Sequence, residues 1–174
     1  MTSSLVVGPL QAFRCWRVEW QDGRPVLGSL FHTTVWPADG PLRAKCEQRP
    51  GSLALLFRRF FSRKVESHAA PAWGCECGIY AMSHLEDDED LKMSPHICQR
   101  GPLDRVMRVA GVAQLWGRVV QHDRGYRAEY ARPLRLLTVP SLVRVRDTEG
   151  LLEAVARRYR IPLVTRAEDL SRAA

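Results

Sequence analysis

The chain has 174 residues and a mass of 19.8 kDa, which suffices for one domain, residues 1–174, with a hydrophobic core. Apolar residues make up 45% and charged residues 26%, which excludes a largely disordered or fibrous protein, and no apolar run approaches the roughly 18 residues of a membrane span. The net charge is +7, and residues 100–174 carry all of it, with fifteen arginines against eight acidic residues.

The basic residues are 23 arginines and 3 lysines. Arginine suits the recognition of phosphate and carboxylate groups, but a GC-rich genome also favours arginine codons. The charge therefore leaves two alternatives open, an acidic partner or a solvated surface. No basic region precedes the first apolar stretch, so we predict no signal peptide, a cytoplasmic protein and no integral membrane association.

The first predicted element is a β-hairpin. Residues alternate from Ala12 to Trp20, Asp22-Gly23 supplies a tight turn, and Pro25 to His32 forms the returning strand. Leu42 to Cys46 is predicted as a short strand or a helical turn.

Residues 50–66 predict a basic amphipathic helix, which we take as an insertion. Ser52 is the expected N-cap, and the apolar residues fall on one helical stripe. Such a helix either packs on its own domain or docks on a partner. Its candidate partner-binding residues are Arg58, Arg59, Phe60, Phe61, Arg63 and Lys64.

The loop from His68 runs into a strand or helix at Ile79, and residues 84–100 predict an exposed, mobile acidic insertion. Val109 to His122 then predicts a strand, with a bulge or a close backbone approach at Gly117 and a turn at 123–125.

The returning strand is expected to end before Pro133, and a third strand is expected from Leu134 to Val139. A helix near 148–160 and an extended piece at 161–164 follow. Thr165 and Glu168 form a capping box, which predicts a last short helix.

The second hairpin combines aromatic residues with arginines. Proteins that bind single-stranded nucleic acid stack bases on such side chains, although aromatic residues of this kind also serve as core. The candidate partner-binding residues here are Trp116, Arg118, Arg124 and Arg127.

A metal site is predicted from Cys46, His68, Cys75 and Cys77. Three thiolates and one imidazole form a set that zinc binds in tetrahedral geometry. The C-x-C spacing would point two thiols apart in an extended segment, but Gly74 and Gly78 let the loop leave strand geometry. An odd count of five cysteines argues against a disulfide framework.

Two alternatives to zinc remain open. Cys75 or Cys77 could be a thiolate nucleophile with His68 as its base, or the cysteines could carry no metal. Neither GxxxxGK[ST] nor GxGxxG occurs, so nucleotide-dependent chemistry has no sequence support.

The segments HAAPAWGCECGIYA and WGRVVQHDRGYRAEYARPLRLL resemble a group of small uncharacterised proteins from high-GC, actinobacterial-type genomes. The resemblance covers roughly residues 12–46, 68–82 and 109–165. It implies a shared fold and the Cys/His cluster, and no reaction. Residues 50–66 and the acidic stretch would be insertions relative to that group.

We therefore predict an α+β fold, in which two to four helices close a twisted antiparallel sheet or small partial barrel. The predicted function is a non-enzymatic binding or regulatory module, zinc-stabilised through the four ligands. Its basic surfaces would engage a protein or nucleic acid. The alternative is a small enzyme that uses the Cys/His loop.

Overall fold

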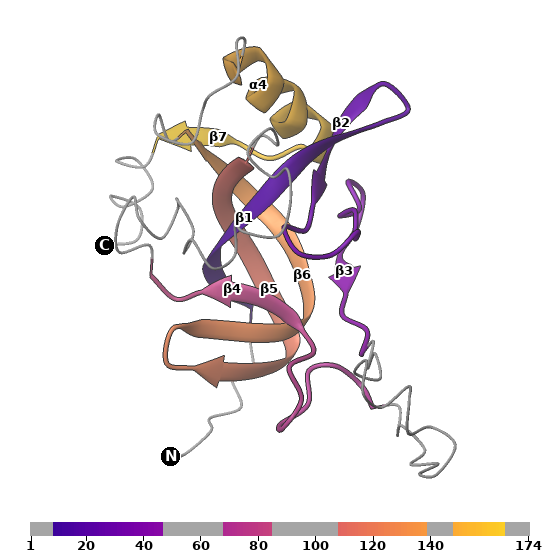
Figure 1. The fold of residues 1–174 in the computed structure, drawn as a ribbon. Coiled ribbons are helices and arrows are strands. Elements are labelled where there is room, and N and C mark those ends of the chain that lie inside the picture. Colours follow the sequence, from indigo (N-terminus) through magenta and orange to yellow (C-terminus); the bar gives the residue numbers. More distant parts are fainter. Residues whose placement is uncertain (1–8, 47–67, 85–107, 139–147, 166–174) are drawn as a thin grey trace.

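The computed structural model describes residues 9–46, 68–84, 108–138 and 148–165 (Figure 1). These residues form seven strands and one helix. The elements are β1 (Leu10–Gln21), β2 (Arg24–Gly28), β3 (Leu42–Arg43), β4 (Ile79–Met82), β5 (Arg108–His122), β6 (Gly125–Thr138), α4 (Thr148–Tyr159) and β7 (Leu163–Thr165).

The predicted α+β class is wrong, because the described part of the chain is nearly all β, with a single short helix. We expected several helices to close the sheet. Instead, β1, β5 and β6 are long strands that pair along most of their length, and this pairing accounts for most of the described structure. The predicted helix at 50–66, the acidic insertion after His84 and the last short helix lie outside the described residues.

Four strands close into a ring. β1 pairs with β5, β5 with β6, β6 with β4, and a single pair, Phe13 with Met82, joins β4 back to β1. All four pairings are antiparallel, whereas β7 adds to β6 in parallel. A small barrel results, with β2, β3 and β7 as extensions of its wall (Figure 1).

The first hairpin confirms its prediction. Asp22 and Gly23 have φ angles of 52° and 69°, and this pair of positive values matches the twist of the flanking strands. The returning strand β2 ends at Gly28, earlier than predicted, and Gly28 forms an isolated bridge with Val35.

The second hairpin consists of two long strands with two register shifts. The predicted bulge at Gly117 is confirmed, since the register shifts between Trp116 and Val119 and Gly117 has a φ of 76°. The predicted break at Pro133 is wrong. Pro133 stays inside β6 because a second shift lets the strand absorb it as a bulge, where Ala113 pairs with Pro133.

The helix α4 confirms its prediction and closes one end of the barrel. Tyr159, in its last turn, is buried. Its hydroxyl accepts a hydrogen bond from the Leu27 N–H at 2.9 Å and donates one to the Trp36 carbonyl at 2.8 Å. One side chain thus joins the helix to β2 and to the loop that follows it.

The core contains a large cluster inside the barrel and a smaller one outside it. Trp16 and Trp36 are in edge-to-face contact at the centre of the large cluster, with ring centroids 5.4 Å apart. Cys15 lies in the small cluster with Leu137 and Val164. Within the described residues, no helix has the length and apolar character to span a membrane.

Candidate metal centre

The structure brings Cys46, His68, Cys75 and Cys77 together. The four ligand atoms, three sulfurs and an imidazole nitrogen, all lie within 4.8 Å of one another, and each residue is partly buried. The thiols are free and not joined in a disulfide. This Cys/His group could hold a metal ion.

The distances inside the group suit a tetrahedral ion. Zn–S bonds of about 2.3 Å and tetrahedral angles place two sulfurs about 3.8 Å apart. The Cys46 and Cys75 sulfurs are 3.8 Å apart. The His68 Nε2 to Cys77 Sγ distance is 3.2 Å, a few tenths of an ångström shorter than a zinc ion would set it.

Short segments along one edge of β6, the edge opposite β5, deliver the ligands. Cys46 follows β3, which pairs with the middle of β6 and is continued by a 2.7 Å hydrogen bond from the Ala44 N–H to the Glu129 carbonyl. The other three ligands precede β4, which pairs with the start of β6. β6 is therefore the common support of the candidate metal centre.

The two glycines flanking the C-x-C motif adopt the conformations that this loop needs. Gly74 has a φ of 80° and Gly78 a φ of 129°. A Cβ atom on Gly78 would lie 3.0 Å from the Arg127 Cβ and 3.1 Å from the Pro71 Cβ. The glycines confirm the predicted departure from strand geometry, because the sulfurs of Cys75 and Cys77 lie in one cluster.

Arg127 holds the loop that contains Cys75 and Cys77 in place. Its side chain comes from β6, and only 4% of the residue is exposed. The guanidinium donates hydrogen bonds to the carbonyls of Cys75 and Cys77, the latter at 3.1 Å, and its Nε donates to His122 Nε2 at 2.6 Å. Arg127 thus occupies carbonyls of the loop that has to turn both sulfurs inward.

The first residues of the loop are tied down as well. Arg118 donates a 2.9 Å hydrogen bond to the Ala69 carbonyl, next to His68. Its side chain joins the bulge of β5 to the segment that carries the imidazole.

The surroundings lower the pKa of the Cys75 thiol and raise the pKa of the Cys46 thiol. A hydrogen bond from the Cys77 backbone N–H lowers the pKa of Cys75 to about 6, so its thiolate is the favoured form at neutral pH. Partial burial, followed by the hydrogen bonds of the neighbouring thiols, raises the pKa of Cys46 to about 11. A thiolate beside protonated thiols is a ready first ligand for a cation.

The predicted partner-binding residues are scattered. Trp116 is half-buried and stacks on Tyr130, with ring centroids 5.9 Å apart, and Arg118 and Arg124 are exposed. Arg127, predicted to contact a partner, is buried, and its guanidinium donates hydrogen bonds to the carbonyls of Cys75 and Cys77. The six residues predicted on the helix at 50–66 lie outside the described residues.

Sequence analysis missed the structural role of Arg127 and the exposed aromatic residues Trp73 and Tyr80, which are 67% and 49% exposed. The alternation of β6 places Arg127 on the opposite face from Tyr126 and Ala128. The role of Arg127 follows from its position opposite the glycine-rich loop. That position depends on the pairing of β4 with β6, which the sequence does not show.

Comparison with known proteins gives no matching family model, no matching curated protein and no matching solved structure.

Proposed function

We propose that this protein is a zinc-stabilised, non-enzymatic binding module. The observation that carries the proposal is the mutual approach of four ligand atoms to within 4.8 Å. The Cys₃His set has no place left for a substrate on a tetrahedral ion, as is usual for structural zinc. The loop held by the metal carries the exposed indole of Trp73, and β4 after it carries the exposed ring of Tyr80.

The first experiment measures zinc per chain and the melting temperature in matched variants. Wild type should contain one zinc. Cys77→Ala should lose the zinc and melt at a lower temperature, because binding energy at a structural site is folding energy. Cys15→Ala is the control, since Cys15 is buried in a separate cluster and should leave the zinc in place. Equal melting of wild type and Cys77→Ala would remove the structural role.

For the partner, we propose an anionic macromolecule, with single-stranded nucleic acid as the class to test first. The net charge of +7 favours association with polyanions, and exposed rings provide surfaces on which bases stack. Trp73 and Tyr80 supply those rings beside the metal loop.

The test is binding of a fluorescent single-stranded oligonucleotide at several salt concentrations. Affinity should fall steeply with salt through counterion release, and Trp73→Ala should weaken binding by about tenfold, from a stacking loss of roughly 1–3 kcal/mol. Trp20→Ala is the matched control, because Trp20 is 65% exposed but lies at the far end of β1. Absent or salt-insensitive binding would exclude nucleic acid and direct the search to acidic proteins.

One observation favours the enzyme alternative, the 3.2 Å contact of His68 with Cys77. A nucleophile and its base lie at such a distance. The two functions differ in thiol reactivity. A catalytic thiol is alkylated rapidly in the protein as isolated, whereas thiols bound to zinc are protected until a chelator removes the metal.

A further inference from the structure

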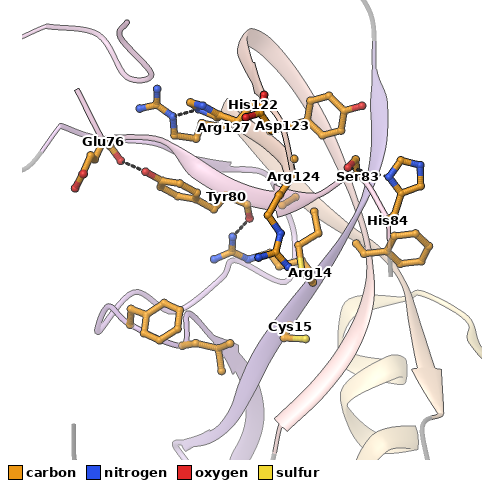
Figure 2. Close-up of a pocket in the computed structure, with 17 residues that line it drawn as sticks. Arg14, Cys15, Glu76, Tyr80, Ser83, His84, His122, Asp123, Arg124 and Arg127 are labelled. Atoms are coloured by element: carbon orange, nitrogen blue, oxygen red, sulfur yellow. Dashed lines mark hydrogen bonds between the residues drawn. The ribbon is translucent and has the colours of Figure 1, made fainter. Parts of the chain in front are cut away.

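An open cavity of about 730 Å³ lies beside β4 (Figure 2), and none of the four metal ligands lines it. It sits at a gap in the ring of strands. On the edge of β1 opposite β5, β4 pairs only at Phe13, and pairing with β2 begins at Arg17. Among the described strands none pairs with that edge in between, and Arg14 and Cys15 of this interval line the cavity.

The walls are largely apolar. Three apolar lining residues pack against the smaller core cluster, and this packing holds their side chains in place: Phe13, Leu30 and Met82. Phe31 and Tyr80 also line it and are 55% and 49% exposed. The exposed faces of these two rings form an apolar surface at the border of the cavity, and no described residue covers it. The volume lies in the range of pockets that bind small molecules.

One cation in this cavity lacks a counter-ion among the described residues. Arg14 donates a hydrogen bond to the Tyr80 carbonyl, and its guanidinium lies 4.8 Å from the centre of the Trp36 ring. Its Nε is buried with no hydrogen-bond partner, and no carboxylate of the described chain forms an ion pair with it.

The state of Arg14 is therefore unusual. Desolvation lowers its pKa to about 10, so the group is still a cation at neutral pH. Arg14 is partly buried, and partial removal of a cation from water without a counter-ion costs free energy that a bound anion would offset.

The other charged residues of the cavity do not fill this role. Arg127 is committed to the metal loop and to His122. Glu76 and Asp123 line the cavity, but neither forms an ion pair with Arg14. In Figure 2 the side chain of Arg124 extends from the turn between β5 and β6 toward Arg14. A guanidinium group beside apolar walls is complementary to an anionic group that carries an apolar body.

We propose that this cavity binds a small organic anion, whose carboxylate, phosphate or sulfonate group pairs with Arg14 and whose apolar body packs on Phe31 and Tyr80. The site shares the ring of Tyr80 with the surface proposed for nucleic acid, and it uses none of the metal ligands.

The test compares two fluorescent probes that share a ring system and differ in charge, 8-anilinonaphthalene-1-sulfonate and neutral N-phenyl-1-naphthylamine. Both are titrated into the zinc-loaded protein at 150 mM salt. We expect one sulfonate probe per chain, bound at least about tenfold more tightly than the neutral probe, because a charge-assisted hydrogen bond is available to the sulfonate only. Equal affinities for the two probes would overturn the proposal.

Variants then locate the site. Arg14→Met should reduce sulfonate-probe affinity about tenfold or more and leave the neutral probe unchanged. Arg24→Met is the control, since Arg24 is exposed at the start of β2 and outside the cavity. Full sulfonate-probe affinity in Arg14→Met would contradict the proposal.

If Arg14→Met does not melt cooperatively, Phe31→Ala decides, because Phe31 is exposed and its loss spares the core. Weaker binding of both probes by Phe31→Ala is expected. Unchanged binding would place the probes elsewhere and overturn the proposal.

Discussion

Arg127 shows how one residue connects the barrel to the metal centre. A buried guanidinium is normally paired with a carboxylate, but here its donors go to the carbonyls of Cys75 and Cys77 and to His122. From the sequence we expected Arg127 to lie on the surface, because the residue pattern of a strand does not show which loop covers its face. Only the pairing of β4 with β6 determines that.

Replacement of Arg127 by methionine should therefore cost about 2–4 kcal/mol of stability, because it leaves buried carbonyls without donors. It should also weaken zinc binding, since both cysteines belong to the loop that Arg127 holds. Urea unfolding and chelator competition measure the two effects. Arg43→Met is the control, because its side chain is 63% exposed and its bridge to Glu129 should contribute about 1 kcal/mol or less. Equal effects of the two substitutions would contradict the assigned role.

Gly78 combines a left-handed φ with close packing. Gly78→Ala should lower the free energy of unfolding by about 1–3 kcal/mol, because the new Cβ would be strained in φ and crowded by Arg127 and Pro71. Gly40→Ala is the matched control, since no atom lies within 4 Å of the Cβ it would add. Urea unfolding compares the two variants. A Gly78→Ala protein as stable as Gly40→Ala would show that the loop does not need this conformation.

The Cys75 thiol should make the zinc-free protein sensitive to pH. Its pKa in the folded protein is about 6, below the usual 9.0, so its contribution to stability is complete above pH 9 and is lost as the pH falls toward 6. Cys46 acts in the opposite sense and only above pH 9, since its pKa is raised to about 11.

Urea midpoints of the zinc-free protein should therefore fall between pH 9 and pH 6. The Cys75→Ser variant, which has no thiol at this position, should show a smaller fall. The same slope in both proteins would mean that Cys75 titrates normally.

Among the elements, the helix α4 and the long strands β1, β5 and β6 determine the fold. The helix was predictable from the apolar stripe of Leu152, Val155, Ala156 and Tyr159, all of which are buried. Its place was not predictable, because it depends on hydrogen bonds that the Tyr159 hydroxyl accepts from the Leu27 N–H and donates to the Trp36 carbonyl, more than 120 residues away in sequence.

Tyr159→Phe keeps the packed ring but leaves the buried Leu27 N–H and Trp36 carbonyl unpaired. We expect a loss of about 2–4 kcal/mol in the free energy of unfolding, from two lost hydrogen bonds in a buried place. Tyr80→Phe provides the comparison, because its hydroxyl donates a 2.6 Å hydrogen bond to the Glu76 carbonyl at an exposed site. Its effect should stay below about 1 kcal/mol. If Tyr159→Phe were equally mild, the hydroxyl would not anchor the helix.

For the whole molecule, local patterns predicted the elements better than their assembly. Asp22-Gly23, the bulge at Gly117 and the stripe of α4 are local signals, and the structure confirms each of them. Pro133 misled the prediction, because a bulge can absorb a proline that otherwise ends a strand. Ring closure through Phe13 and Met82, and hence the nearly all-β class, depends on pairing between distant segments.

The metal ligands were predictable for a different reason. Cysteine and histidine are uncommon, so Cys46, His68, Cys75 and Cys77 formed a recognisable set without any structure. The cavity at Arg14 had no such signal. An arginine in an apolar strand gives no indication that a gap between β2 and β4 opens beside it.

The most direct test of the central claim is zinc K-edge X-ray absorption of the protein purified under reducing conditions. The proposed centre predicts three sulfur neighbours at about 2.3 Å and one nitrogen at about 2.0–2.1 Å. Cys46→Ser should reduce the sulfur count to two and leave the nitrogen in place. A shell of oxygen and nitrogen alone would contradict the account, as would a protein that binds no zinc although its three thiols are reduced and its imidazole is intact.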